Sequence, residues 1–124
     1  MEIKNIKTYR QSVIREKDLL VSDSGYIRWS YEMHRAMGYA ARVVVGQVKG
    51  YDHLYEIRGV TIAEGAYKVY TRRNGTAFIR VSREKVKSLN LVGKYEAQPH
   101  DGFILFNTKD KLKKTVKDGE LNDE

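Results

Sequence analysis

Four basic residues form two pairs that share the same spacing in the sequence. Arg28 and Arg80 lie 52 residues apart, and so do Arg35 and Lys87. Arginine and lysine bind phosphate oxygens, and the arginine fork can also donate two hydrogen bonds to a guanine edge. Two similar basic surfaces could therefore meet the phosphates of a polyanion at two places. The alternative for Arg28 and Arg80 is an exposed strand charge that protects a sheet edge.

Three further residues could contribute to such a surface. Arg72 and Arg73 precede a Gly-containing turn, where they could contact a ligand or simply be solvated. Trp29 alternates out of phase with Arg28, so in a strand it should point into the core. Stacking on a nucleic-acid base is the alternative for Trp29.

No catalytic or metal-binding pattern is evident. The chain has no Cys, and the three His at positions 34, 53 and 100 lack the paired spacing of a metal site. His53 lies close to Asp52 and Glu56, but a single His beside carboxylates is more often a surface pair. There is no nucleophile-elbow serine and no phosphate loop. We therefore expect a protein that is not an enzyme and uses no metal and no cofactor.

The basic pairs belong to a longer internal repeat. The string YIRWSYEMHRAMGY at residues 26–39 matches FIRVSREKVKSLNL at residues 78–91. The identical pairs are Ile27/Ile79, Arg28/Arg80, Ser30/Ser82 and Glu32/Glu84. Because a repeat redefines the unit that folds, we expect two similar units in one chain.

Each repeat predicts strand, turn, strand, short helix, strand, turn, strand. The expected elements of the first copy are two extended runs within 19–29, a helix at 31–37 and strands at 42–48 and 54–60. Those of the second copy are a linking strand at 67–71, a short helix before Asn90, and strands at 94–98 and 103–108. Ser30 is placed to cap the first helix, and Gly38 and Asn90 can adopt the left-handed conformation that ends such helices. The predicted fold class is mostly β with short helices.

We divide the chain into a first unit at 1–62, a second unit at 63–108 and a charged C-terminal tail at 109–124. No Gly/Ser-rich or low-complexity linker separates the two units, so we expect them to pack as one body. The tail is expected to be a solvated or frayed terminus rather than a packed helix.

The charge is typical of a protein that binds a polyanion. The 124 residues include 23 Lys and Arg against 16 Asp and Glu, a net charge of +7. Four of the 16 acids lie in the last seven residues, which leaves 12 acids against all 23 bases in the rest of the chain. Such a field attracts nucleic acid or an anionic membrane. Because no stretch has the apolar length of a membrane span and the N-terminus lacks a signal-peptide core, we expect a cytoplasmic protein with no membrane partner.

The segment SDSGYIRWSYEMHRAMG, residues 22–38, resembles the swapped-hairpin motif of the SpoVT-AbrB family. That motif combines a Gly-Arg strand, a short Glu-Leu-Arg-Arg-x-Leu-Gly helix and two further strands. Residues 32–38 follow the helix almost position for position, and residues 84–90 follow it more loosely. The resemblance covers residues 19–57 and 70–108, most of the chain.

In that family, two copies from separate chains interlock into one β-barrel-like DNA-binding unit. The resemblance therefore implies two tandem AbrB-like swapped-hairpin motifs that pack as one pseudo-twofold β-barrel-like domain. The positions that match the family's DNA-facing basic residues are Arg28, Arg35, Arg80 and Lys87. The family's proline before the helix is replaced by Ser30 and Ser82. The antitoxin branch, which resembles MazE, shares the fold and also binds a partner toxin.

These features predict a non-enzymatic protein that binds double-stranded DNA, as a transcriptional regulator or a small architectural factor. Its predicted contacts are Arg28, Arg35, Arg80 and Lys87, with Arg72 and Arg73 as secondary ones. One alternative is a protein-interaction module, such as an antitoxin or an inhibitor of a host enzyme. The other is a single-stranded RNA-binding protein, suggested by the many tyrosines. The sequence also leaves a protein partner and a homodimer open.

Overall fold

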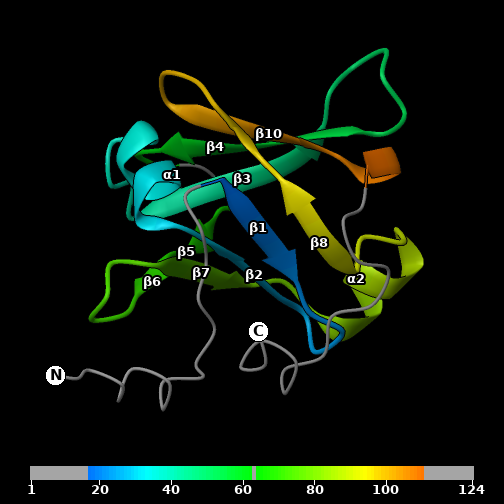
Figure 1. Cartoon of the computed structure of the whole chain (residues 1–124), viewed down its shortest axis with the longest axis horizontal. Helices are drawn as coiled ribbons and strands as arrows, with labels where there is room; N and C mark the ends of the chain where they lie inside the picture. Colours follow the sequence, from blue (N-terminus) through cyan, green and yellow to red (C-terminus); the bar gives the residue numbers. More distant parts are fainter. Residues whose placement is uncertain (1–16, 63, 111–124) are drawn as a thin grey trace, which may run out of the picture.

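Antiparallel β-strands make up most of the regular secondary structure of the described residues. The computed structural model describes residues 17–62 and 64–110 (Figure 1). The strands are β1 (Asp18–Val21), β2 (Tyr26–Trp29), β3 (Arg42–Gln47), β4 (Leu54–Val60), β5 (Tyr67–Lys68), β6 (Tyr70–Thr71), β7 (Ala77–Arg80), β8 (Gly93–Glu96), β9 (Gln98–Pro99) and β10 (Phe103–Asn107). The helices are α1 (Tyr31–Ala36), α2 (Arg83–Ser88) and a 3-10 turn at Thr108–Asp110. The prediction of a mostly β fold with short helices is confirmed.

The strands form two antiparallel five-stranded sheets. Sheet A has the order β6-β7-β2-β1-β8, and sheet B has the order β5-β3-β4-β10-β9. The chain passes between the sheets three times: through α1 from β2 to β3, and at two corners, where Val69 separates β5 from β6 and Ala97 separates β8 from β9. The two-residue strands β5, β6 and β9 adjoin these corners, and Pro99 of β9 has no N–H to donate to a ladder. The expected β-barrel-like closure is therefore wrong, because the strands divide into two separate sheets.

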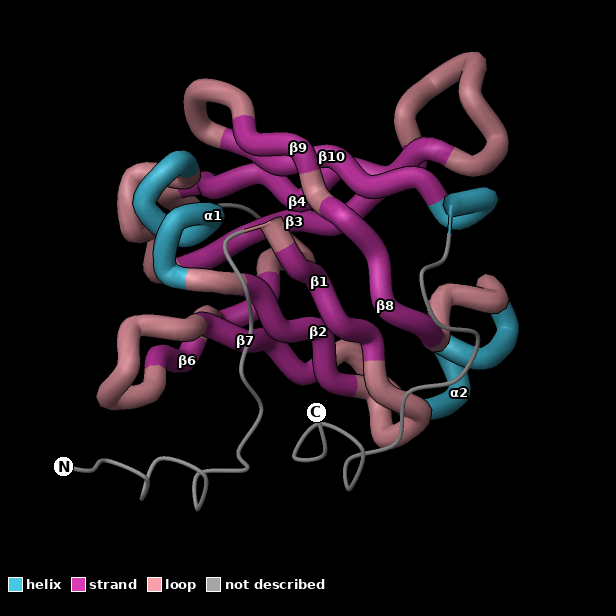
Figure 2. The backbone as a smooth tube through the Cα atoms, viewed as in Figure 1, coloured by secondary structure: helices cyan, strands magenta, loops and turns pink. Residues whose placement is uncertain are grey.

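Each sheet contains strands from both halves of the sequence. The pairing of β2 with β7 in sheet A places Tyr26 opposite Arg80, Ile27 opposite Ile79, and Arg28 opposite Phe78. A shift of 52 residues exchanges the partners of these pairs, so the register has an approximate twofold relation centred on Ile27 and Ile79. In keeping with that relation, α1 and α2 lie at opposite ends of the molecule (Figure 2).

The two helices begin with the same side-chain cap. The Ser30 hydroxyl oxygen accepts a 3.2 Å hydrogen bond from the backbone N–H of Met33. The Ser82 hydroxyl oxygen accepts the matching bond, of 3.0 Å, from the N–H of Lys85. Each cap satisfies an N–H that has no partner inside the helix, and loss of such a cap costs about 1 kcal/mol. The predicted capping role of Ser30 is confirmed.

The two helices also end in the same way. Gly38 and Asn90 have φ values of 71° and 57°, in the left-handed region. The residues that follow them, Tyr39 and Leu91, donate backbone hydrogen bonds of 3.0 and 2.8 Å to carbonyls five residues earlier. This is the Schellman arrangement, which satisfies carbonyls left over at a helix C-terminus. The predicted conformations of Gly38 and Asn90 are confirmed.

The correspondence between the halves is lost after the last turn of each copy. Gly50 and Gly102 still match, with φ values of 88° and 92°. Tyr51, however, lies exposed in its turn, whereas Phe103 already begins β10. The linking strand expected at 67–71 is also divided, because β5 pairs with β3 in sheet B and β6 pairs with β7 in sheet A.

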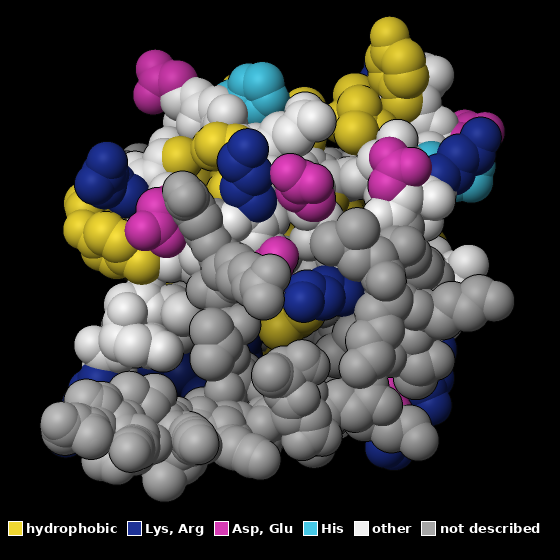
Figure 3. Space-filling view, viewed as in Figure 1, with side chains coloured by type: hydrophobic (Ala, Val, Ile, Leu, Met, Phe, Trp, Pro, Cys, Tyr) yellow, Lys and Arg dark blue, Asp and Glu magenta, His cyan; other side chains and the backbone are white. Residues whose placement is uncertain are grey.

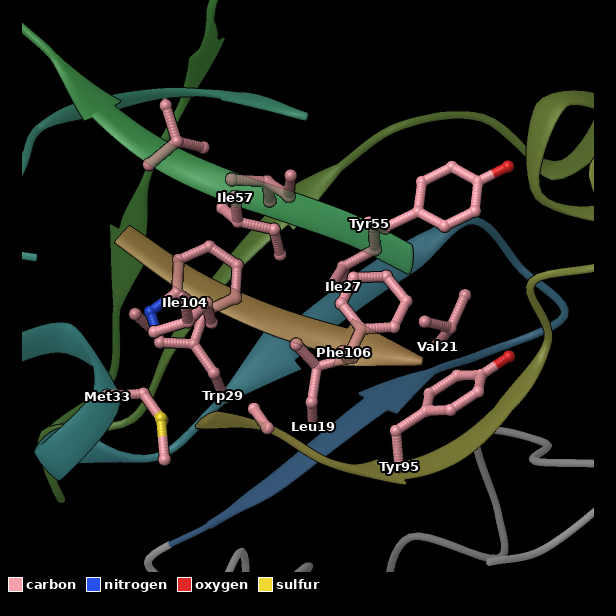
Figure 4. Packing of buried hydrophobic residues seen from close by; sticks show 14 of the residues in the cluster. Leu19, Val21, Ile27, Trp29, Met33, Tyr55, Ile57, Tyr95, Ile104 and Phe106 are labelled. Atoms are coloured by element: carbon pink, nitrogen blue, oxygen red, sulfur yellow. The ribbon is translucent and has the colours of Figure 1, made fainter. Parts of the chain in front are cut away.

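The inner faces of the two sheets enclose one hydrophobic core. Trp29, Tyr95 and Phe106 are the largest fully buried side chains in the described part of the chain. Figure 4 shows Trp29 and Met33 at the end of the core beside α1, and Tyr55 and Tyr95 at the other end. Burial of each large apolar side chain contributes roughly 1.5 to 3 kcal/mol to stability. The prediction that Trp29 points into the core is confirmed.

Two further expectations concern the chain's ends and its relation to a membrane. Among the residues described, no helix has the length and apolar character to cross a membrane. The predicted tail at 109–124 lies outside the described residues after Asp110.

Candidate nucleic-acid interface

The outer face of sheet A carries alternating aromatic and basic side chains. Successive side chains of a strand point to opposite faces of the sheet. On β2 and β7 the inward residues, all fully buried, are Ile27, Trp29, Ala77 and Ile79. Their neighbours, which lie on the outer face and are called the central quartet below, are Tyr26, Arg28, Phe78 and Arg80. Strand pairing sets each ring of the quartet beside the arginine of the other half.

A chain of ring contacts runs across this face. Phe78 meets Tyr26 edge-on, with ring centroids 5.7 Å apart, and stacks on Tyr70 of β6 at 5.3 Å. The Arg80 guanidinium lies 5.4 Å from the Tyr26 centroid, and that of Arg72 lies 5.6 Å from the Phe78 centroid. A cation over a ring is stabilised by about 0.5 to 1 kcal/mol at an exposed site. The rings therefore restrain two long side chains that would otherwise move freely.

The two arginines of the quartet differ in exposure. Arg80 is exposed, whereas Arg28 is half-buried. The register places Arg28 between Leu20 of β1 and Phe78 of β7, and its Nε has no contact with solvent. The Nε of Arg28 is thus closed to a ligand, while the guanidinium of Arg80 lies on an exposed residue.

Arg72 and Arg73 lie in the hairpin between β6 and β7, at the edge of the same face. The backbone N–H of Arg72 donates a 2.9 Å hydrogen bond to the Thr76 carbonyl, which closes the hairpin. The Arg72 guanidinium joins the central quartet through its contact with Phe78. Arg73 is exposed in the turn itself.

The other two predicted contacts are on the helices. Arg35 is exposed on α1 and Lys87 is exposed on α2. Because the helices lie at opposite ends of the molecule, the structure does not bring these two residues together (Figure 2). They can only extend a basic surface away from the central quartet, one at each end.

Charge is distributed unevenly over sheet A. The arginines lie on β2, on β7 and in the hairpin between β6 and β7, whereas Asp18 and Glu96 lie on β1 and β8, and the Lys94 ammonium is 3.6 Å from the Asp18 carboxylate. On sheet B, Arg58 is paired with Glu56 of the same strand at 2.8 Å. Figure 3 shows acidic and basic side chains interspersed over the α1 and sheet B end of the molecule. On the described residues of sheet A, a polyanion would therefore meet the basic side chains mainly on the β7-β2 side.

Three aromatic residues of this face are absent from the sequence prediction, namely Tyr26, Tyr70 and Phe78. The signal for two of them is the repeated aromatic-Ile-Arg pattern at 26–28 and 78–80, which puts a ring and a guanidinium on one face of a strand. Lys68, whose ammonium lies 5.3 Å from the Tyr70 centroid, has no matching signal, because the repeat does not extend to it.

The histidines occupy three unrelated environments. His34 is buried, its Nδ1 finds no hydrogen-bond partner among the described residues, and burial lowers its pKa. His53 approaches the Thr108 hydroxyl at 3.4 Å, and His100 stacks on Phe103 with centroids 4.7 Å apart. In the part of the chain that the structure covers, no three His, Asp or Glu side chains gather in a way that could hold a metal ion.

Comparisons of the chain with protein-family models, with curated protein sequences and with solved structures find no match.

Proposed function

We propose that this protein binds duplex DNA, without catalysis, through the outer face of sheet A. The observation that carries the proposal is the central quartet, which two halves of one chain build equally across β2 and β7. Arg28 and Arg80 are diagonal neighbours in this register, with backbones roughly 7 to 8 Å apart. Two guanidiniums so placed can contact two phosphates at once.

The twofold character of the quartet suits a duplex. The pairs of the β2–β7 ladder are related about Ile27 and Ile79 by the 52-residue offset. Proteins that bind duplex DNA commonly match its local twofold symmetry with their own, so that equivalent groups meet both strands. Arg28 and Arg80 would then lie near the two phosphate backbones, with Arg80 the more accessible of the two.

The arrangement of the rings favours duplex DNA over single-stranded nucleic acid. Stacking of an unpaired base needs an open ring face. Here Arg80 lies over Tyr26, Arg72 lies over Phe78, and Tyr70 stacks on Phe78. The rings position guanidiniums, whose N–H groups can donate to phosphates. Single-stranded RNA binding is the second candidate, because Tyr70 is 45% exposed and could accept one base in place of the Lys68 ammonium that lies over its ring.

The mixed composition of both sheets supports the AbrB-like interpretation. In each sheet, two adjacent strands from before residue 62 are flanked on both sides by strands from after it. Both helices share their caps and their C-terminal hydrogen bonds. One chain would then supply both copies of the swapped-hairpin motif. The corresponding role is that of a cytoplasmic transcriptional regulator or small architectural factor, with Arg35 and Lys87 near the flanking DNA.

Fluorescence anisotropy with a labelled random-sequence duplex, and with single-stranded RNA of equal length, tests the proposal. The duplex should bind more tightly, and its affinity should fall steeply with salt because bound counterions are released. Tighter binding to the RNA would favour the second candidate. Absence of duplex binding at low salt would overturn nucleic-acid binding and favour a protein-interaction module.

A further inference from the structure

A cavity of about 170 Å³ opens between the two sheets beside α2. Much of its wall is apolar and comes from Ile27, Val45, Val81, Leu89 and Leu91. The Leu89 side chain is 43% exposed, so it lies at the rim. An apolar cavity of roughly 150 Å³ in another protein stays dry and binds benzene. The cavity beside α2 is therefore large enough for a single ring or a short branched chain.

The cavity exists because the two halves of the chain fill equivalent positions differently. In the first half the three positions that face this layer are Trp29, Met33 and Met37, which are all buried. The residues 52 positions later are Val81, Lys85 and Leu89, which are half-buried or exposed. Figure 4 shows Trp29 and Met33 filling the α1 end of the core. The smaller Val81 and the exposed Lys85 at the rim leave the α2 end open.

The polar groups at the cavity are suited to an anion. The Lys85 ammonium lies 3.4 Å from the Tyr67 hydroxyl, and both side chains line the cavity. No Asp or Glu is among the described residues that line it. An ammonium and a hydroxyl can both donate to one carboxylate, and such charge-assisted bonds are among the strong ones. Apolar walls with a few convergent donors are typical of small-molecule sites.

We propose that this cavity binds a small monocarboxylic acid whose body is one aromatic ring or a branched chain of about six carbons. The ring or branched chain occupies the space at the α2 end that corresponds to the one filled by Trp29 and Met33 at the α1 end. The carboxylate accepts hydrogen bonds from Lys85 and Tyr67. A ligand of about ten non-hydrogen atoms in such a site should bind with a dissociation constant of roughly 0.1 to 1 mM. This site does not depend on DNA binding by sheet A.

Methyl and amide NMR titrations with three probes test the proposal: phenylacetate, its neutral analogue phenylacetamide, and acetate. Phenylacetate should shift the signals of Ile27, Val45 and Leu89. Phenylacetamide should bind there roughly tenfold more weakly, because it lacks the charge that Lys85 recognises. Acetate should give no saturable shift at these residues, because it lacks the apolar body.

Variants separate charge from shape. Lys85→Gln should remove the preference for phenylacetate over phenylacetamide, whereas Lys87→Gln, on the same helix but outside the cavity lining, should leave it intact. Val81→Trp with Lys85→Met, which copies the first half, should abolish binding of both probes. If that variant does not fold, Lys85→Gln still decides the question.

Three results would overturn the proposal. They are equal affinity for the acid and the amide, an unchanged preference in Lys85→Gln, and phenylacetate shifts confined to the arginines of sheet A.

Discussion

Replacing both arginines of the central quartet by alanine should weaken duplex binding and flatten its salt dependence. Each phosphate contact contributes about 0.9 to the slope of log affinity against log salt. If Arg28, Arg80, Arg72 and Lys68 each contact one phosphate, the slope is about −3.6, and affinity falls about 150-fold between roughly 50 and 200 mM salt. The variant Arg28→Ala/Arg80→Ala keeps two contacts, so its slope is about −1.8 and the fall is about 12-fold.

Fluorescence anisotropy across that salt range measures both slopes. The matched control is Arg42→Ala/Lys49→Ala, which removes the same charge from exposed positions on sheet B and its hairpin. Equal loss of affinity in the two double variants would mean that net charge, and not the quartet, drives binding. Because Arg28 is half-buried, thermal unfolding should be measured beside each titration. The single variant Arg80→Ala, at an exposed position, tests the same idea with about half the change in slope.

Three predictions concern stability, each measured by urea denaturation. Burial lowers the pKa of His34, so below about pH 6.5 the unfolded state binds a proton at this residue more readily than the folded state. The free energy of unfolding should therefore fall as pH falls. The variant His34→Leu should remove this fall. Tyr95→Phe should cost about 1 to 3 kcal/mol, because the buried hydroxyl no longer donates its 2.6 Å bond to the Leu91 carbonyl; no loss would mean that water replaces the bond. Gly25→Ala should be more destabilising than Gly50→Ala by roughly 2 kcal/mol. Both glycines have a positive φ, but only at Gly25 would an added Cβ lie 2.6 Å from a backbone carbon. Equal losses of stability in the two variants would contradict this clash.

Features decided by neighbouring residues could be predicted from the sequence. A cap such as Ser30 needs only an N–H three residues later, and the left-handed Gly38 and Asn90 need only a helix that ends before them. The burial of Trp29 follows from alternation along a single strand. The repeat made these local signals easier to read because each occurs twice.

Features decided by distant partners could not be predicted in the same way. The contact between Tyr26 and Arg80 depends on the register of β2 against β7, which no local pattern specifies. The corners between the sheets interrupt the ladders and prevent the expected barrel. The cavity was also hidden, because the difference between Trp29 and Val81 matters only once both sheets pack around them.

The most direct test of duplex binding by sheet A is to map the contact surface by backbone amide NMR during titration with a short random-sequence duplex. If the central quartet binds DNA, the largest shifts will occur at residues 26–29, 70–73 and 77–80, and the outer face of sheet B will change little. If the largest shifts fall on β4 and β10, or if no residue of sheet A responds, the quartet is not the DNA-binding surface.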